Sequence, residues 1–174
     1  MKNQILNFVV LVIVSIVFFS CNSESPEAAS EGYKVQTEAY TFYSDQKKYQ
    51  DANARRGESD ECQFSWSIRN VKRNGNVLTL DISRPAGCEV EYELIWNGMI
   101  LESFPMMANV FIKAISDGCT DQDEDTTDIL EIDLEKALKD TSLSTLSNTN
   151  FNIREFCAFK DVQCMEGCDV AVSN

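Results

Sequence analysis

The sequence contains no histidine, and among its 174 residues Lys and Arg number only 15 against 28 Asp and Glu. The absence of histidine excludes the Ser-His-Asp triad, the Cys-His dyad, histidine-ligated zinc and a histidine-based pH switch. A formal net charge of −13 argues against DNA or RNA as a partner, because phosphate binding requires clustered Lys and Arg. The chain does have 44% apolar residues and 10% aromatics, which is enough for a folded domain.

The chain also lacks an apolar run long enough to span a membrane stably. Its longest such run, residues 8–19, would cover about 18 Å as a helix, whereas a hydrocarbon core is roughly 30 Å thick. Lys2 precedes this run, and a positive start followed by a short apolar segment is typical of a secretory signal peptide. Phe18-Phe19-Ser20-Cys21 then resembles a bacterial lipobox, which implies cleavage before Cys21 and lipidation of its sulfur.

The expected organisation therefore has three parts. Residues 1–20 are the signal peptide, residues 21–32 are the lipidated Cys21 with a flexible acidic tether, and residues 33–174 are a single domain. The expected location is the bacterial cell envelope, anchored by lipid in the outer membrane of a Gram-negative cell, with the periplasmic and surface faces left open. The alternative is an ordinary signal peptide followed by an unmodified cysteine.

Apolar and polar residues alternate in the folded part with a period of two, which is typical of β-strands. Strands are expected at residues 33–37, 62–69, 78–83, 88–96, 110–115, 129–134 and 151–159. Asn74-Gly75 between two of these stretches is a strong hairpin signal. Helix signals are scarce, and the one clear candidate, residues 44–57, would bury little. We therefore predict an all-β fold, an antiparallel β-sandwich, immunoglobulin-like or similar, of seven to eight short strands.

Part of the chain resembles a known family. The residues that carry the resemblance are, in chain order, Gly87-Cys88, Trp96, Pro105, Asp117-Gly118-Cys119 and Ile132-Asp133-Leu134. This order resembles the C-terminal β-sandwich of the NigD-like and related small envelope lipoproteins of Bacteroidetes. The resemblance implies a sandwich in the envelope and a Cys88–Cys119 bridge, and it implies no reaction. The chain departs from the family in having Glu89-Val90-Glu91 where a histidine often follows the first cysteine, and in three further cysteines near its C-terminus.

If Cys21 carries lipid, six cysteines remain in the predicted domain: Cys62, Cys88, Cys119, Cys157, Cys164 and Cys168. Because compartments outside the inner membrane are oxidising, we expect structural disulfides, and the sequence alone does not fix their pairing. The alternative is a redox or zinc site at Cys164 and Cys168. Three residues separate those two cysteines, however, whereas thioredoxin-like motifs and most zinc knuckles use two.

The acidic segment over residues 117–128 offers a candidate metal site. Asp121, Asp123 and Asp125 have the spacing that opens an EF-hand calcium loop. Thr126 stands at the sixth position instead of glycine, and Ile132 at the twelfth instead of glutamate, so the sharp turn and the bidentate ligand are missing. The favoured interpretation is a solvated acidic loop and no cofactor, with Ca²⁺ as the alternative.

A pair of carboxylates is the other candidate for chemistry. Glu89, Glu91 and Glu93 share one face of a predicted strand, and alternate residues on a strand lie about 6.8 Å apart. That distance is within the range for inverting glycoside hydrolases, although a solvated strand surface is the simpler interpretation.

Aromatic and methionine side chains complete the candidates. Met106 and Met107 cannot both face inward on a strand, so one of them is a candidate for an exposed binding patch. The core is the expected place for Phe64, Trp66, Tyr92 and Trp96.

These observations predict a lipid-anchored envelope protein with a non-catalytic binding or structural accessory role. Its expected contacts are the membrane, through Cys21, and a protein, peptide or glycan, but no nucleic acid. The alternatives are a carboxylate-only hydrolase acting on glycans and a calcium-stabilised adhesion module. A hydrolase would require a deep cleft with two converging carboxyl groups.

Overall fold

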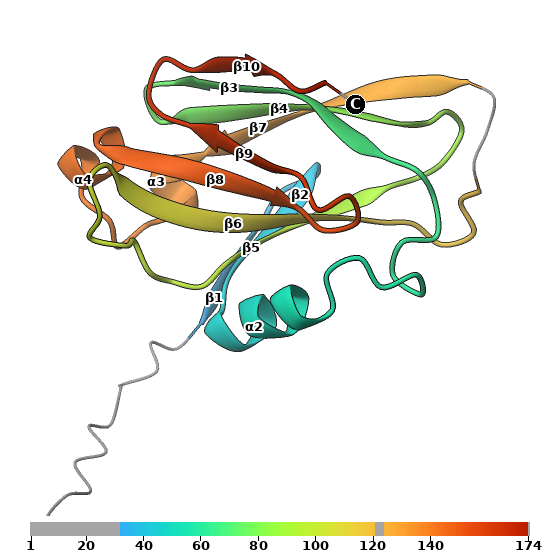
Figure 1. Cartoon of the computed structure of the whole chain (residues 1–174), viewed down its shortest axis with the longest axis horizontal. Helices are drawn as coiled ribbons and strands as arrows, with labels where there is room; N and C mark the ends of the chain where they lie inside the picture. Colours follow the sequence, from blue (N-terminus) through green and yellow to red (C-terminus); the bar gives the residue numbers. More distant parts are fainter. Residues whose placement is uncertain (1–31, 121–123, 174) are drawn as a thin grey trace, which may run out of the picture. The chain divides into compact units, whose positions relative to one another are not determined.

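The computed structural model describes residues 32–120 and 124–173 (Figure 1). These residues form ten strands and three helices: β1 Tyr33–Gln36, β2 Tyr40–Ser44, α2 Gln46–Ala54, β3 Ser67–Asn74, β4 Val77–Pro85, β5 Glu91–Trp96, β6 Met106–Ile115, β7 Asp125–Asp133, α3 Leu134–Ala137, α4 Leu143–Ser147, β8 Thr149–Glu155, β9 Asp161–Cys164 and β10 Asp169–Ala171. None of the helices in this part of the chain is long and apolar enough to cross a membrane.

The strands form two sheets that pack face to face, which confirms the predicted β-sandwich (Figure 1). One sheet has six strands in the order β1-β2-β5-β6-β8-β9, and the other has four in the order β10-β3-β4-β7. The strands number ten rather than seven to eight, and the pairs β2–β5 and β6–β8 are parallel. The parallel pairs arise because the intervening chain visits the other sheet and re-enters the six-stranded sheet from the same end.

The main core lies between the two sheets and is built from alternate residues of the strands, as the period-two pattern predicts. Leu78, Leu80 and Ile82 of β4 are almost completely buried and face this core. Phe64, Trp66, Tyr92 and Trp96 are buried in the same cluster, so their predicted location is confirmed.

Helix α2 covers part of the outer face of the six-stranded sheet (Figure 1). Its N-cap is Asp45, whose carboxylate accepts a hydrogen bond of 2.9 Å from the Lys48 amide. The Tyr49 ring lies 5.0 Å from the Phe111 ring, and Phe111 belongs to a second apolar cluster with Ile95. As predicted, the helix itself buries little, since Ala52 is its one buried residue, but β5 and β6 present apolar side chains beneath it, so the sheet carries apolar residues on both faces.

The six cysteines of the domain form three disulfides: Cys62–Cys157, Cys88–Cys119 and Cys164–Cys168. The prediction of structural disulfides is thus confirmed, and the second bridge is the one that the family resemblance implied. The first bridge joins the segment after α2 to the end of β8, and the third closes the turn between β9 and β10.

Candidate binding face

Several predicted site residues can now be placed, while Cys21, Asp121 and Asp123 lie outside the described residues. Asp125 begins β7, where its carboxylate accepts a hydrogen bond of 3.0 Å from Ser83. Among residues 32–120 and 124–173, no three Cys, Asp or Glu side chains lie together as metal ligands. Residues 125–128, at the end of the acidic segment, belong to β7 and pair with β4.

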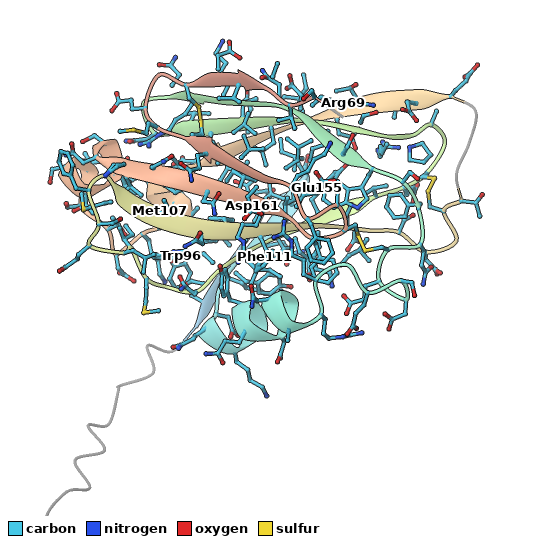
Figure 2. All side chains as sticks on the ribbon, viewed as in Figure 1. Arg69, Trp96, Met107, Phe111, Glu155 and Asp161 are labelled. Carbon is cyan, nitrogen blue, oxygen red and sulfur yellow. A yellow bond between two sulfur atoms is a disulfide. The ribbon has the colours of Figure 1, made fainter. Side chains whose placement is uncertain are left out.

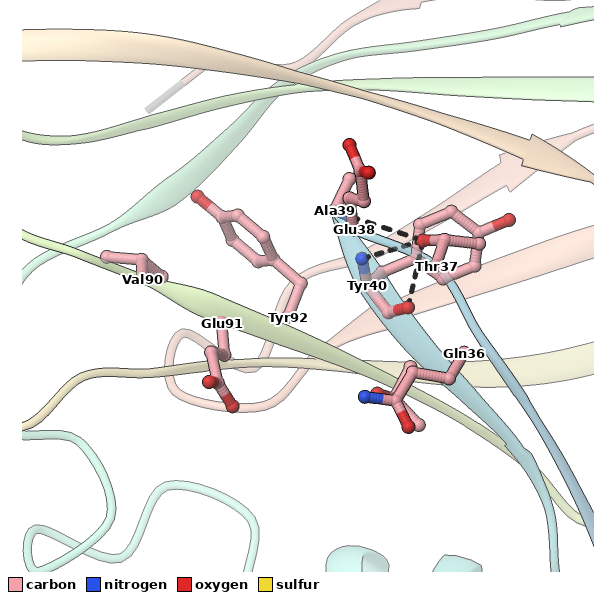
Figure 3. Close-up of a pocket in the computed structure, with 9 residues that line it drawn as sticks. Gln36, Thr37, Glu38, Ala39, Tyr40, Val90, Glu91 and Tyr92 are labelled. Atoms are coloured by element: carbon pink, nitrogen blue, oxygen red, sulfur yellow. Dashed lines mark hydrogen bonds between the residues drawn. The ribbon is translucent and has the colours of Figure 1, made fainter.

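Two of the three candidate carboxylates, Glu91 and Glu93, lie on β5, on the side of the six-stranded sheet that faces away from the main core. Glu93 forms an ion pair of 3.0 Å with Lys48 of α2, so it is not a freely solvated side chain. Glu91 is exposed and lines a pocket beside the turn between β1 and β2 (Figure 3). Glu89 precedes β5, and its backbone carbonyl accepts a hydrogen bond of 2.5 Å from the Ser116 hydroxyl.

The pocket beside Glu91 is too small to hold a sugar ring in a closed site. Its volume is about 130 Å³, whereas small-molecule sites span roughly 300–1,000 Å³. The Thr37 hydroxyl in this pocket is already used by the turn, since it accepts hydrogen bonds from the Tyr40 and Ala39 amides at 3.0 and 3.3 Å (Figure 3). The pocket gives little support to the hydrolase alternative.

Next to α2, amide side chains stand in register across three neighbouring strands. Asn109 of β6 pairs with Asn152 of β8, and Asn152 pairs with Gln163 of β9. Because neighbouring strands lie about 4.8 Å apart, the three amides form a row roughly 10 Å long. The adjacent register position pairs Met107 with Asn150. We call these five residues the amide face.

The amide groups hydrogen-bond to one another in pairs. Nδ2 of Asn152 donates to Oδ1 of Asn109 at 2.9 Å, and Nδ2 of Asn150 donates to Oε1 of Gln163 at 3.2 Å. The amide nitrogens of Asn109 and Gln163 donate no hydrogen bond within the described part of the chain. These two side chains are half-buried and exposed respectively, so their N–H groups remain for a ligand.

Arg154 of β8 lies at one end of the amide face, and its register partner on β9 is Asp161. Its Nη1 donates hydrogen bonds to the Tyr49 hydroxyl at 3.1 Å and to Asn53 at 3.0 Å, both on α2. Its guanidinium lies 4.4 Å from the centre of the Phe111 ring. Figure 2 shows Met107, Phe111 and Asp161 on the strands that carry this face. The helix thus fixes the Arg154 cation beside the row of amides, and Arg154 and Arg56 in turn form ion pairs with the Asp161 carboxylate.

The sequence pattern predicts one of the two methionines as a contact and does not indicate the amides. Met107 lies on the amide face, whereas Met106 has the opposite orientation on β6, and both are half-buried. The asparagines at 150 and 152 do alternate with Phe151 and Ile153, but nothing local in the sequence indicates which strand lies beside them.

Comparisons with protein-family models, with curated proteins and with solved structures found no match. The similarity to NigD-like lipoproteins therefore remains a prediction from the motif order alone.

Proposed function

We propose that this chain is a lipid-anchored envelope protein with a non-catalytic binding role, and that the amide face binds a glycan. The two end members of the row, Asn109 and Gln163, carry the proposal, while Asn152 between them is buried and holds Asn109 in place by its hydrogen bond. Amide groups both donate and accept hydrogen bonds, so a row of them matches the neighbouring hydroxyl groups of a sugar. A face three strands wide suits an extended chain that lies across the sheet rather than a small molecule enclosed in a cavity.

The chemistry of the face favours a glycan over a protein partner. Cores of protein interfaces are enriched in aromatic residues and methionine, whereas four of the five residues of the amide face are amides. Arg154 and Asp161 at the end of the row add a donor and an acceptor that are already held in place by α2 and Arg56. Preorganised polar groups of this kind reduce the entropy lost when a polar polymer binds.

Two kinds of observation support the envelope location. The start of the chain has the signal and lipobox pattern, with Cys21 as the expected lipid attachment. The domain carries three disulfides, which form and persist in oxidising compartments outside the cytosol. Mass spectrometry of the intact mature protein tests the anchor directly, because an unmodified Cys21 would contradict it.

The binding role is tested by titrating the purified protein against a panel of envelope and plant polysaccharides. We expect at least one polysaccharide to bind, and the double variant Asn109→Ala/Gln163→Ala to weaken binding about tenfold or more, as loss of two hydrogen bonds implies. Gln36→Ala, an exposed amide on β1 of the same sheet, is the matched control and should leave binding unchanged. Equal binding by the double variant would exclude the amide face. Turnover that disappears in Glu91→Gln would favour the hydrolase instead.

A further inference from the structure

The loop between β5 and β6, residues 97–105, presents apolar side chains to solvent. Phe104 is fully exposed at 104% of its reference area, and Met99 and Leu101 are 46% and 44% exposed. Nine large apolar side chains are exposed in the described residues, and three of them come from this one loop. Such a concentration marks an interaction surface, whereas single exposed apolar residues need no explanation.

The loop is held in a defined conformation. Leu101 and Met107 exchange two backbone hydrogen bonds, of 2.8 and 3.2 Å. The buried Trp96 donates a hydrogen bond of 2.9 Å from its indole nitrogen to the Met99 carbonyl. Because these contacts fix the base of the loop, its apolar side chains can contact a partner with little further loss of conformational entropy.

The loop leaves the domain at the same end as the start of the described chain. Gly32 lies against the carbonyl of Ser44, and Ser44 is the register partner of Trp96, the last residue before the loop. The Asp45 amide also donates a hydrogen bond of 2.9 Å to the Trp96 carbonyl. Figure 1 shows the start of β1 and the loop between β5 and β6 at one end of the sandwich.

We propose that Met99, Leu101 and Phe104 contact the bilayer in which Cys21 is anchored, which rests on the proposed lipidation. Gly32 follows Cys21 by eleven residues, so even a fully extended chain holds it within about 40 Å of the lipid. A tether this short gives the loop an effective concentration near the membrane in roughly the millimolar range, so a weak apolar contact is sufficient.

The chemistry of the loop indicates which lipid surface it meets. Its only charged residue, Glu102, is exposed and can remain among the headgroups while Phe104 reaches the acyl boundary. The chain has a formal net charge of −13, so an anionic lipid surface would repel it. The contact is therefore apolar, and a zwitterionic phosphatidylcholine bilayer is the appropriate probe.

The test places a tryptophan on the loop. The full protein with Phe104→Trp is extracted from membranes and reconstituted into phosphatidylcholine vesicles with and without brominated acyl chains. Both native tryptophans, Trp66 and Trp96, are buried and give a constant background. We expect the added tryptophan to shift to the blue and to lose most of its emission in brominated vesicles. Ile129→Trp, at an exposed position on β7, is the control and should not be quenched. Leu101→Trp provides a second reporter on the same loop.

Flotation of the vesicles measures whether the protein is anchored to the membrane, independently of whether the loop contacts the bilayer. Protein that floats but shows equal emission in brominated and unbrominated vesicles for both Phe104→Trp and Leu101→Trp overturns the bilayer contact and leaves the anchor intact. A blue shift without quenching also overturns it, since another protein then covers the loop. Protein that fails to float and carries an unmodified Cys21 overturns the anchor, and the loop contact with it.

Discussion

The Tyr92 hydroxyl of β5 donates a hydrogen bond of 2.8 Å to Oδ2 of Asp128 in β7, and this bond joins the two sheets. Arg84 of β4 completes the group by donating to both carboxylate oxygens of Asp128, at 2.5 and 3.0 Å. Its Nη1 also donates to the Cys88 carbonyl at 2.7 Å. Burial raises the pKa of Asp128, but the hydrogen bonds from Arg84 and Tyr92 outweigh burial and hold that pKa below its usual value.

The first prediction concerns Asp128→Asn. A carboxyl whose pKa is lower in the folded state than in the unfolded state contributes stability above the unfolded value of about 3.9, and loses that contribution as pH falls through the folded pKa. We expect the variant to lower the free energy of unfolding by about 1.5–3 kcal/mol at pH 7, because hydrogen bonds to a charged group are lost. The difference should shrink at pH 3. Urea denaturation at both pH values measures it, with Asp81→Asn on the outer face of β4 as the control; equal losses at both pH values would contradict the argument.

Glu155, the last residue of β8, has a pKa shifted in the opposite direction from that of Asp128. Its side chain is 0% exposed, and neither carboxyl oxygen accepts a hydrogen bond within the described residues. Burial raises the pKa of Glu155, and the nearby backbone amide of Ile68, together with the positive charges of Lys160, Arg56 and Arg69, offsets only part of that effect. Stability that depends on the neutral carboxyl is complete below the unfolded pKa of about 4.3 and is lost as pH rises through the folded pKa.

The second prediction is therefore that Glu155→Gln stabilises the protein at pH 8 and leaves its stability nearly unchanged at pH 4. There is a pH range in which Glu155 is ionised in the unfolded state but neutral in the folded state. Over that range the wild-type free energy of unfolding should fall by up to about 1.4 kcal/mol per pH unit. Thermal or urea unfolding across pH 4–9 measures this slope. Glu131→Gln, an exposed position on β7, should not alter it. If the free energy of unfolding of Glu155→Gln fell with pH as steeply as that of the wild type, other groups would be responsible for the pH dependence.

The sequence predicts which strand residues face the core, because that depends only on the local alternation of apolar and polar residues. Leu78, Leu80 and Ile82 face the core because a strand places alternate residues on one side, and that rule requires no knowledge of neighbours. The covering by α2 could not be predicted, because in the continuous apolar run Leu94-Ile95-Trp96 the alternation no longer distinguishes the two faces.

The amide face depends on long-range pairing. Asn109 and Asn152 become neighbours only because β6 and β8 run parallel, after the chain has crossed to the other sheet through β7. No spacing within either strand encodes that register. The Cys88–Cys119 bridge was accessible only through the family resemblance, and the other two pairings had no sequence signal.

The third prediction ranks the three disulfides by their effect on stability. The bridges Cys62–Cys157, Cys88–Cys119 and Cys164–Cys168 close loops of 95, 31 and 4 residues. If each acts by restricting the unfolded chain, replacing both cysteines of a bridge by alanine should cost about 4.7, 3.7 and 1.9 kcal/mol in that order. Guanidinium denaturation of the three double variants measures the ranking. A loss for Cys164–Cys168 as large as that for Cys62–Cys157 would show that folded-state contacts dominate.

The last prediction is that Ca²⁺ does not stabilise the fold through Asp125. The EF-hand spacing would require residues 125–132 to continue a loop, but they lie in β7, paired with β4, and Ile132 at the twelfth position is completely buried. Asp125 already accepts a hydrogen bond from Ser83 and lies 3.9 Å from Arg69. Since a ligand that binds only the folded state raises the melting temperature, millimolar Ca²⁺ should leave it unchanged in wild type and in Asp125→Asn alike. A rise in wild type that disappears in Asp125→Asn would establish a calcium site and favour the adhesion module.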